Sequence, residues 1–297
     1  NGLDDLRNGI IRHVDDKSFG EDPLRVLRAA QFAARFGFII APETKKIMQK
    51  MDLSTLSSER IYGELQKAML KSKKPSIFFE VLREVNQLDI WFPELKNLIG
   101  CEQNAFYHPE GDVWNHTMEV IDNAALVKND TSNPEFFMMA ALSHDLGKFL
   151  SCEIDSDGVA HSYQHEIIGI DEARRFVSRL TNNVAINKYV CDMVKNHMRP
   201  HVAFNNKSRI KRTNQMFDES INALDLIKLA FVDSSNRRNL AEVIDENKFL
   251  TDRLNIYVKR IIEPEVLGKD LIALGIKPGP VFSTILKEAH KKHLSFV

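Results

Sequence analysis

The stretch Ala140-Ala-Leu-Ser-His-Asp-Leu-Gly-Lys-Phe149 joins an apolar run to the adjacent polar residues His144 and Asp145. The apolar run predicts a buried helix over residues 136–149. A histidine beside a carboxylate is a poor pair for an apolar core, because both side chains need polar partners. The same pair offers the imidazole nitrogen and carboxylate oxygen that bind divalent metals. One such pair is a frequent accident in a chain with ten histidines, so a metal site needs further ligands.

Further ligand types lie on other predicted helices. His116 falls in the first turn of a helix that follows a polar loop, and Asp233 directly follows the apolar run 226–232. A lone buried carboxylate is costly, which favours a partner for Asp233. Helical bundles build metal sites from inward-facing side chains of separate helices, so these residues can converge by folding. The C-terminal half shows almost no two-residue alternation and is predicted to be all-helical.

The order His116, His144-Asp145, Asp233 resembles the HD superfamily of metal-dependent phosphohydrolases. This resemblance implies that His165 and His197 are additional metal ligands. One or two divalent ions would lower the pKa of a bound water and polarise phosphoryl oxygens. Mixed His and Asp ligation without thiolate favours Mn, Ni, Fe, Co or Mg over a structural zinc.

Asp145 and Lys148 are the predicted catalytic residues. Lys148 lies four residues after His144, so we expect it on the same helix face or just beyond the helix end, as a phosphate contact. Arg237 lies one turn after Asp233 and is equally well explained as a phosphate contact or a surface charge. Among the remaining histidines, the role of His108 stays open. The others are expected to be surface or hydrogen-bonded structural residues, namely His13, His161, His201, His290 and His293.

A second polar pattern lies near the N-terminus. Asp22-Pro23 predicts the start of a helix that ends at Gly37, and Arg25, Arg28 and Arg35 line one side of it. A carboxylate beside guanidinium groups can read the edge of a base, although a solvated face with internal ion pairs explains the spacing as well.

The segment 21–32 resembles the EDxxR motif of class II tRNA nucleotidyltransferases and bacterial poly(A) polymerases. The resemblance implies that Asp22, Arg25 and Arg28 bind the incoming nucleotide, ATP or CTP, in an intact parent protein. Segments 56–65, 92–95 and 268–282 are similar to later signatures of the same family. Family members with an HD region are associated with 2′,3′-cyclic phosphodiesterase, 2′-nucleotidase and phosphatase activities. CCA addition and poly(A) addition are both open for the parent.

We expect four parts in this chain of 297 residues. Residues 1–20 are interpreted as a remnant of a nucleotidyltransferase head, 21–100 as a helical neck and body that contacts nucleotide and tRNA, 101–262 as the HD domain and 263–297 as a helical tail. The paired acidic residues that follow Gly-Ser in the family's polymerising site have no match here, so we expect the catalytic head to be missing and transferase activity to be absent.

Composition gives no general reason to bind nucleic acid, because 40 Lys and Arg residues balance 41 Asp and Glu residues. Three cysteines without paired spacing indicate reduced thiols and a cytoplasmic protein, and the lack of a long apolar run argues against a membrane protein.

Two alternatives to a hydrolytic fragment stay open. One is a catalytically inert helical arm that binds RNA and positions tRNA, and the other is a stand-alone HD nucleotide phosphohydrolase.

Overall fold

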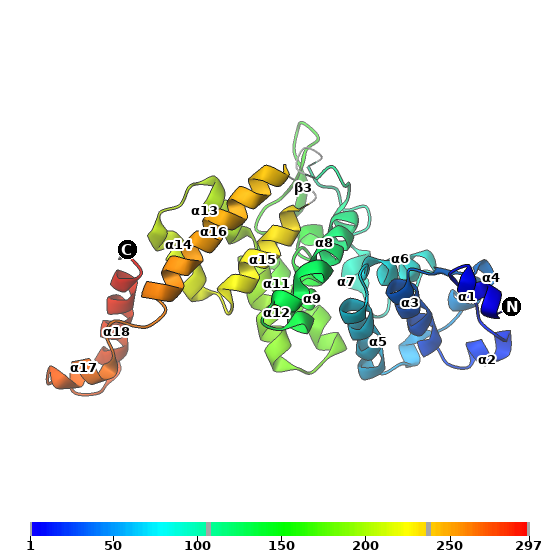
Figure 1. The fold of residues 1–297 in the computed structure, drawn as a ribbon, viewed down its shortest axis with the longest axis horizontal. Helices are drawn as coiled ribbons and strands as arrows, with labels where there is room; N and C mark the ends of the chain where they lie inside the picture. Colours follow the sequence, from blue (N-terminus) through cyan, green and yellow to red (C-terminus); the bar gives the residue numbers. More distant parts are fainter. Residues whose placement is uncertain (1, 105–107, 236–238, 296–297) are drawn as a thin grey trace.

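The computed structural model describes residues 2–104, 108–235 and 239–295. Helices follow one another along an elongated molecule, with the N-terminus at one end and the tail helices at the other (Figure 1). This arrangement confirms the predicted all-α fold class. Within the described ranges, each helix is too short or too polar to span a lipid bilayer.

Short helices and one tiny parallel sheet build the N-terminal part. Its helices are α1 (Gly2–Arg7), α2 (Asp16–Gly20), α3 (Leu24–Phe36), α4 (Pro42–Met48), α5 (Ser58–Lys71), α6 (Ser76–Glu84) and α7 (Pro93–Lys96), with a 3-10 turn η1 (Leu53–Thr55). The strands β1 (Ile10–Ile11) and β2 (Ile39–Ile40) pair in parallel. Helix α3 ends as predicted at Gly37, whose left-handed backbone lets its N–H bond to the carbonyl of Ala33. Its apolar face packs against α5 and α6.

A larger helical bundle forms the C-terminal part. Its helices are α8 (Val113–Val127), α9 (Pro134–Ser143), α10 (Lys148–Ser151), α11 (His165–Leu180), α12 (Val184–Asn196), α13 (Met198–Asn205), α14 (Ile210–Glu219), α15 (Ala223–Ser234) and α16 (Leu240–Arg260), with a 3-10 turn η2 (Lys128–Asp130). Helix α9 is buried around its whole circumference from Phe137 to Ser143, as expected for a helix that is apolar on every side. It packs against α8, α12 and α15.

Partly buried polar contacts and a continuous apolar core join the two parts. Arg179 on α11 donates to both carboxylate oxygens of Glu94 on α7, at 2.5 and 2.6 Å. Trp114 on α8 donates its indole N–H to Glu80 on α6 at 2.6 Å. The apolar core extends without interruption across the same boundary. The N-terminal helices therefore support the bundle that carries the predicted metal ligands.

The chain departs from a helix at residues 144–147. Helix α9 ends at Ser143, and the turn through His144 and Gly147 leads into the short helix α10, so the prediction of one continuous helix over 136–149 is wrong. The reason lies in the packing of Gly147 against Gly169 of α11. A Cβ atom at Gly147 would lie 2.1 Å from the carbonyl oxygen of His165 and 2.6 Å from the backbone nitrogen of Gly169.

A second correction concerns the expectation that the C-terminal half is all-helical. The strands β3 (Cys152–Ile154) and β4 (Ala160–Ser162) form an antiparallel hairpin between α10 and α11. A turn at residues 155–158 lies at its tip, where Gly158 has a φ of 77°. Strands of three residues are too short to produce a visible alternation of apolar and polar residues.

The tail consists of α17 (Gly268–Ala273) and α18 (Pro280–His293), which pack against each other at one end of the molecule (Figure 1). Helix α18 has no fully buried residue among those described. Helix α18 begins at Pro280, directly after Pro278 and Gly279. A proline is tolerated in the first turn because its missing N–H has no helical partner there.

Replacing Gly147 with Ala should lower the free energy of unfolding by about 1–3 kcal/mol or more, because the added Cβ forces α10 away from α11. The matched control is Gly63→Ala in the interior of α5, where a Cβ meets nothing within 4 Å. That change should leave stability unchanged or raise it by up to about 1 kcal/mol. Urea unfolding of both variants measures the difference, and equal midpoints would contradict the close approach at Gly147.

Candidate metal centre

Six buried imidazoles and carboxylates meet in the C-terminal bundle. They come from the first turn of α8, the end of α9, the start of α11, the junction of α12 with α13, and the end of α15. None is more than 6% exposed. The residues are His116, His144, Asp145, His165, His197 and Asp233. The structure thus places all six predicted metal ligands together, although separate helices carry most of them.

One cluster surrounds the Nε2 atoms of His116 and His144, which lie 3.2 Å apart. Asp233 Oδ1 lies 3.0 Å from His116 Nε2, and Asp145 Oδ2 lies 3.1 Å from His144 Nε2. The ligand atoms of His116, His144 and Asp145 all lie within 4.8 Å of one another, and Asp233 Oδ1 lies beside the two histidines, so the cluster carries the donor types of a divalent transition metal.

A second cluster uses the other oxygen of Asp145. Asp145 Oδ1 lies 3.3 Å from His165 Nε2 and 3.6 Å from His197 Nε2, and these two nitrogens are 3.2 Å apart. The carboxylate of Asp145 therefore borders both clusters, with one oxygen facing each. Asp145 could therefore supply a ligand atom to an ion held at either cluster.

Three of the imidazole rings are oriented by backbone carbonyls so that Nε2 faces the centre. His144, His165 and His197 each place Nδ1 at 2.7–2.8 Å from the backbone carbonyl oxygen three residues earlier in the chain. The Nδ1–H can donate to that carbonyl, so the Nε2 lone pair points into the centre. His116 makes the equivalent contact with a carboxylate, because its Nδ1 lies 2.9 Å from Glu110 Oε1.

Burial and neighbouring charges set the protonation of the metal-free centre. Burial alone would lower the pKa of His144, but the carboxylates of Asp145 and Asp233 outweigh it and raise this pKa to about 9. Burial prevails at His197 and lowers its pKa to about 4. Burial would raise the pKa of Asp145, yet His144 and Lys148 hold it well below its usual value. At neutral pH a metal ion has to displace a proton from His144.

Lys148 is buried beside the centre. Its ammonium group lies 2.6 Å from Asp145 Oδ2 and donates to Gln103 Oε1 at 2.7 Å. Of the two expected positions for Lys148, the structure shows the one beyond the end of the helix, because the turn at 144–147 separates it from α9 and Lys148 opens α10. The new helix nevertheless directs the ammonium group to the predicted ligand Asp145.

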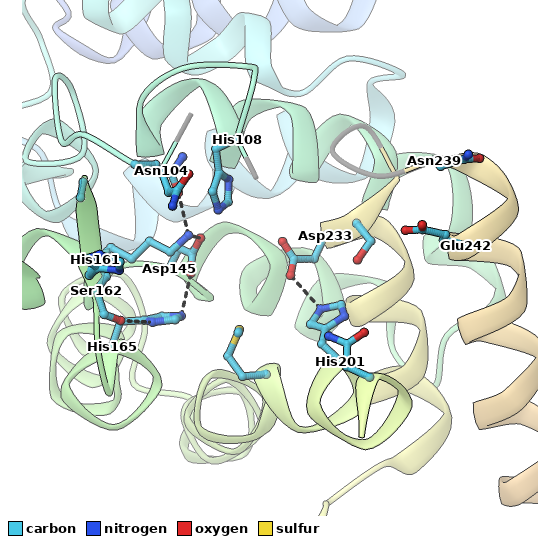
Figure 2. Close-up of a pocket in the computed structure, with 16 residues that line it drawn as sticks. Asn104, His108, Asp145, His161, Ser162, His165, His201, Asp233, Asn239 and Glu242 are labelled. Carbon is cyan, nitrogen blue, oxygen red and sulfur yellow. Dashed lines mark hydrogen bonds and ion pairs between the residues drawn. The ribbon is translucent and has the colours of Figure 1, made fainter. Parts of the chain in front are cut away.

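The centre opens into a cavity of about 720 Å³. Asp145, Lys148 and His165 line one side together with the hairpin, and Figure 2 shows Asp233 and His201 facing them across the pocket. Polar side chains complete the lining, namely Gln103, Asn104, His108, Asn205, Asn239 and Glu242. The cavity is large enough for a nucleotide-sized ligand.

The sequence did not indicate several residues of this site. His201, expected among the surface or hydrogen-bonded histidines, is buried with Nε2 at 3.0 Å from Asp233 Oδ2 and Nδ1 at 2.8 Å from Glu246 Oε1. Burial alone would lower the pKa of His201, but these two carboxylates raise it. Glu110 bridges His116 and His108, at 2.9 Å from each. The four-residue spacing of His197 and His201 was the available signal for His201.

The predicted nucleotide residues lie elsewhere, at the start of α3 in the N-terminal part (Figure 1). Asp22 accepts hydrogen bonds from Arg60 at 3.0 and 3.2 Å, which joins the two N-terminal signatures. Arg25 is half-buried and Arg28 is exposed. The structure therefore separates these residues from the metal ligands. Arg237, the second predicted phosphate contact, falls outside the described residues.

The fold and the site define a helical bundle in which histidine and aspartate side chains gather at a buried centre. Two protein families match parts of this chain. The HD domain family matches residues 113–237. The family described as a probable RNA- and SrmB-binding site of polymerase A matches residues 37–99.

Curated relatives match about two thirds of the chain. The chain is 42% identical over 207 residues to a multifunctional CCA protein of Actinobacillus pleuropneumoniae. The aligned residues cover 67% of this chain and 49% of the relative. The corresponding protein of Pasteurella multocida is 41% identical over 211 residues, covering 68% of this chain and 49% of that protein. The chain thus spans about half the length of these relatives.

Solved structures show the same fold. The apo form I of a CCA-adding enzyme has a TM-score of 0.62 at 18% identity, covering 100% of this chain and 61% of that one. The Thermotoga maritima CCA-adding enzyme complexed with tRNA has a TM-score of 0.59 at 19% identity, covering 99% and 62%. The chain is homologous to the multifunctional CCA proteins, with a poly(A) polymerase RNA-binding region followed by an HD domain, which confirms the resemblance seen in the sequence.

Manganese should bind more tightly as the pH rises from about 6 to about 9, because the metal displaces the proton that His144 holds with a pKa of about 9. One released proton predicts about a tenfold gain in affinity per pH unit below that pKa. Titration calorimetry in buffers of different ionisation enthalpy measures both the affinity and the proton release. The control is His13→Ala, whose histidine contacts Thr44 away from the centre. An affinity that does not change with pH would contradict this account of the ligands.

Proposed function

We propose that the C-terminal bundle is a divalent-metal-dependent phosphohydrolase that acts on phosphoesters of nucleotides or RNA ends. The observation that carries the proposal is the pair of buried ligand clusters that share Asp145 and open into one cavity beside Lys148. A purely structural role would leave the buried groups Asp145, His165 and Asp233 without a reason to line a pocket. The match to the HD domain family supports the same class of chemistry.

His116, His144, Asp145 and Asp233 would hold one ion, and Asp145, His165 and His197 a second. The donor set suits Mn, Ni, Fe, Co or Mg. When bound, such ions supply a water of lowered pKa and polarise the phosphoryl oxygens. The residues of the chain orient these ligands. Glu110 and the backbone carbonyls fix the imidazole tautomers, and Lys148 borders the cavity as a positive charge for the phosphate.

For Lys148 to contact a substrate, its ammonium group has to share its hydrogen bonds between Asp145 and the phosphate. Lys148 has three N–H donors and contacts Asp145 and Gln103, so one donor is available for a phosphate oxygen. A charged donor next to the reacting phosphate would stabilise the charge that develops on it. We therefore propose Lys148 and Asp145 as catalytic residues.

We further propose that the N-terminal part is the nucleotide- and tRNA-contacting neck and body of a CCA-adding or poly(A)-adding type of protein. The match of residues 37–99 to an RNA-binding region and the relatives' names support this. CCA-adding enzymes of the same fold have been solved with CTP and with ATP. Asp22, Arg25 and Arg28 would contact the nucleotide, with Arg60 orienting the Asp22 carboxylate. The proposed parts are residues 21–100, 101–262 and 263–297.

A second candidate function is an inert helical arm that binds RNA without hydrolysing it. The observation in its favour is the RNA-binding match in the N-terminal part, which requires no metal. The two candidates differ in one property. Only the phosphohydrolase needs an intact set of metal ligands for its activity.

The Mn-loaded protein should hydrolyse adenosine 2′,3′-cyclic phosphate, and a chelator should abolish the reaction reversibly. Asp145→Ala removes the carboxylate that borders both clusters, so its kcat should fall by about a thousandfold or more. The matched control is Asp171→Ala on the exposed face of α11, which should keep full activity. Product formation followed by chromatography measures the rates. An inactive wild-type protein after loading with Mn and with Ni would reject the hydrolase and favour the RNA-binding arm.

A further inference from the structure

The hairpin β3–β4 contributes an aromatic ring to the wall of the metal-centre cavity. His161 on β4 lines that cavity together with Asp145, Lys148 and His165. Figure 2 places His161 and Ser162 beside His165, on the opposite side of the pocket from Asp233. The side chain of His161 is 31% exposed, so part of its ring is open to a ligand.

The His161 ring is fixed in orientation from two directions. Tyr163 stacks parallel to it, with ring centroids 5.3 Å apart and an angle of 6° between the planes. Asp155 Oδ2 accepts a hydrogen bond from His161 Nε2 at 2.8 Å. The other oxygen of Asp155 accepts from the backbone N–H groups of Asp157 and Val159, both at 2.9 Å. The carboxylate that shapes the hairpin turn therefore also holds the ring.

This arrangement differs from that of an ordinary surface histidine. A histidine that serves only to stabilise the hairpin has no need for a parallel aromatic ring, and Tyr163 itself is 68% exposed. His161 lines the cavity and is stacked on Tyr163, so the pair forms the start of a stack to which a further planar ring can be added. Every nucleobase has such a planar face, and stacking on aromatic side chains tolerates any base sequence.

We propose that His161, supported by Tyr163, is the nucleobase-stacking residue of this site. The inference rests on the proposed phosphohydrolase function and adds a subsite to it. The phosphate of the substrate lies at Lys148 and the ligand clusters, and the attached nucleoside extends along the hairpin wall with its base against His161. The substrate class is then a nucleotide or a nucleotide-terminated RNA end, and a phosphoester without a base binds less well.

The hairpin also ties this subsite to the centre. Ser162, the residue after His161, provides the backbone carbonyl at 2.8 Å from His165 Nδ1. A change at His161 could therefore disturb the ligand His165 indirectly. The test needs a substrate that uses the centre but offers no base, and a variant that keeps an aromatic ring at position 161.

The experiment compares adenosine 2′,3′-cyclic phosphate with glycerol 1,2-cyclic phosphate, which has the same cyclic diester and no base. For His161→Ala, the KM for the adenosine substrate should rise about five- to hundredfold. Its kcat, and both constants for the glycerol substrate, should stay near wild type. His161→Phe, which keeps a ring and loses the Asp155 hydrogen bond, should retain most of the adenosine affinity. Tyr163→Ala should give a smaller rise in KM.

Equal loss on both substrates in His161→Ala would overturn the stacking role and indicate a disturbed centre. An unchanged KM for the adenosine substrate would overturn it as well. Equilibrium binding of adenosine 2′-monophosphate, measured by calorimetry, separates this inference from the proposed function. If wild type hydrolyses neither substrate but binds the nucleotide more tightly than His161→Ala does, the hydrolase fails and the stacking site stands. If wild type and variant bind it equally, or not at all, the stacking site fails.

Discussion

The carboxylate of Asp145 is the group on which the candidate site depends. It is buried, and it lies within 3.6 Å of ring nitrogens from His116, His144, His165 and His197, with Lys148 at 2.6 Å from the same oxygen that faces the first cluster. Desolvating one carboxylate and several imidazoles is costly unless each finds a charged or metal partner. The bundle is arranged so that separate helices deliver those partners to one point.

Local chain geometry does much of this positioning. Three of the histidines sit at helix ends and use Nδ1 to contact the carbonyl oxygen three residues before, so one short backbone motif fixes the tautomer and the ring direction together. The contact between Gly147 and Gly169 then brings the turn after α9 against α11 and places His144 and His165 around Asp145. On the opposite side of the pocket, His201 links Asp233 to Glu246 on α16.

The sequence was sufficient for the helical fold class, the bounds of α3 and the set of residues that converge on the centre. Apolar periodicity and helix-end residues determine the first two. The order of His116, His144, Asp145 and Asp233 along the chain, and the resemblance to the HD superfamily that adds His165 and His197, indicate the third. Glu110 was out of reach because a polar residue in a loop shows its partner only after folding, and the spacing of His201 from His197 indicates a shared helix side without revealing the partners Asp233 and Glu246. The break at residues 144–147 depends on a close backbone approach to α11, and the hairpin 152–162 depends on the Asp155 turn. The break is a tertiary effect and the hairpin a very local one, and the periodicity of apolar residues indicates neither.

The most direct test of the account is an anomalous-difference map from crystals of the protein soaked in Mn²⁺ and measured near the manganese edge. The account predicts a peak within coordination distance of His116, His144, Asp145 and Asp233, and a second peak near His165 and His197 if the centre holds two ions. Peaks only at surface carboxylates, or a centre without a peak in well-ordered crystals at a pH of about 8, would contradict the central claim that these side chains form a metal site.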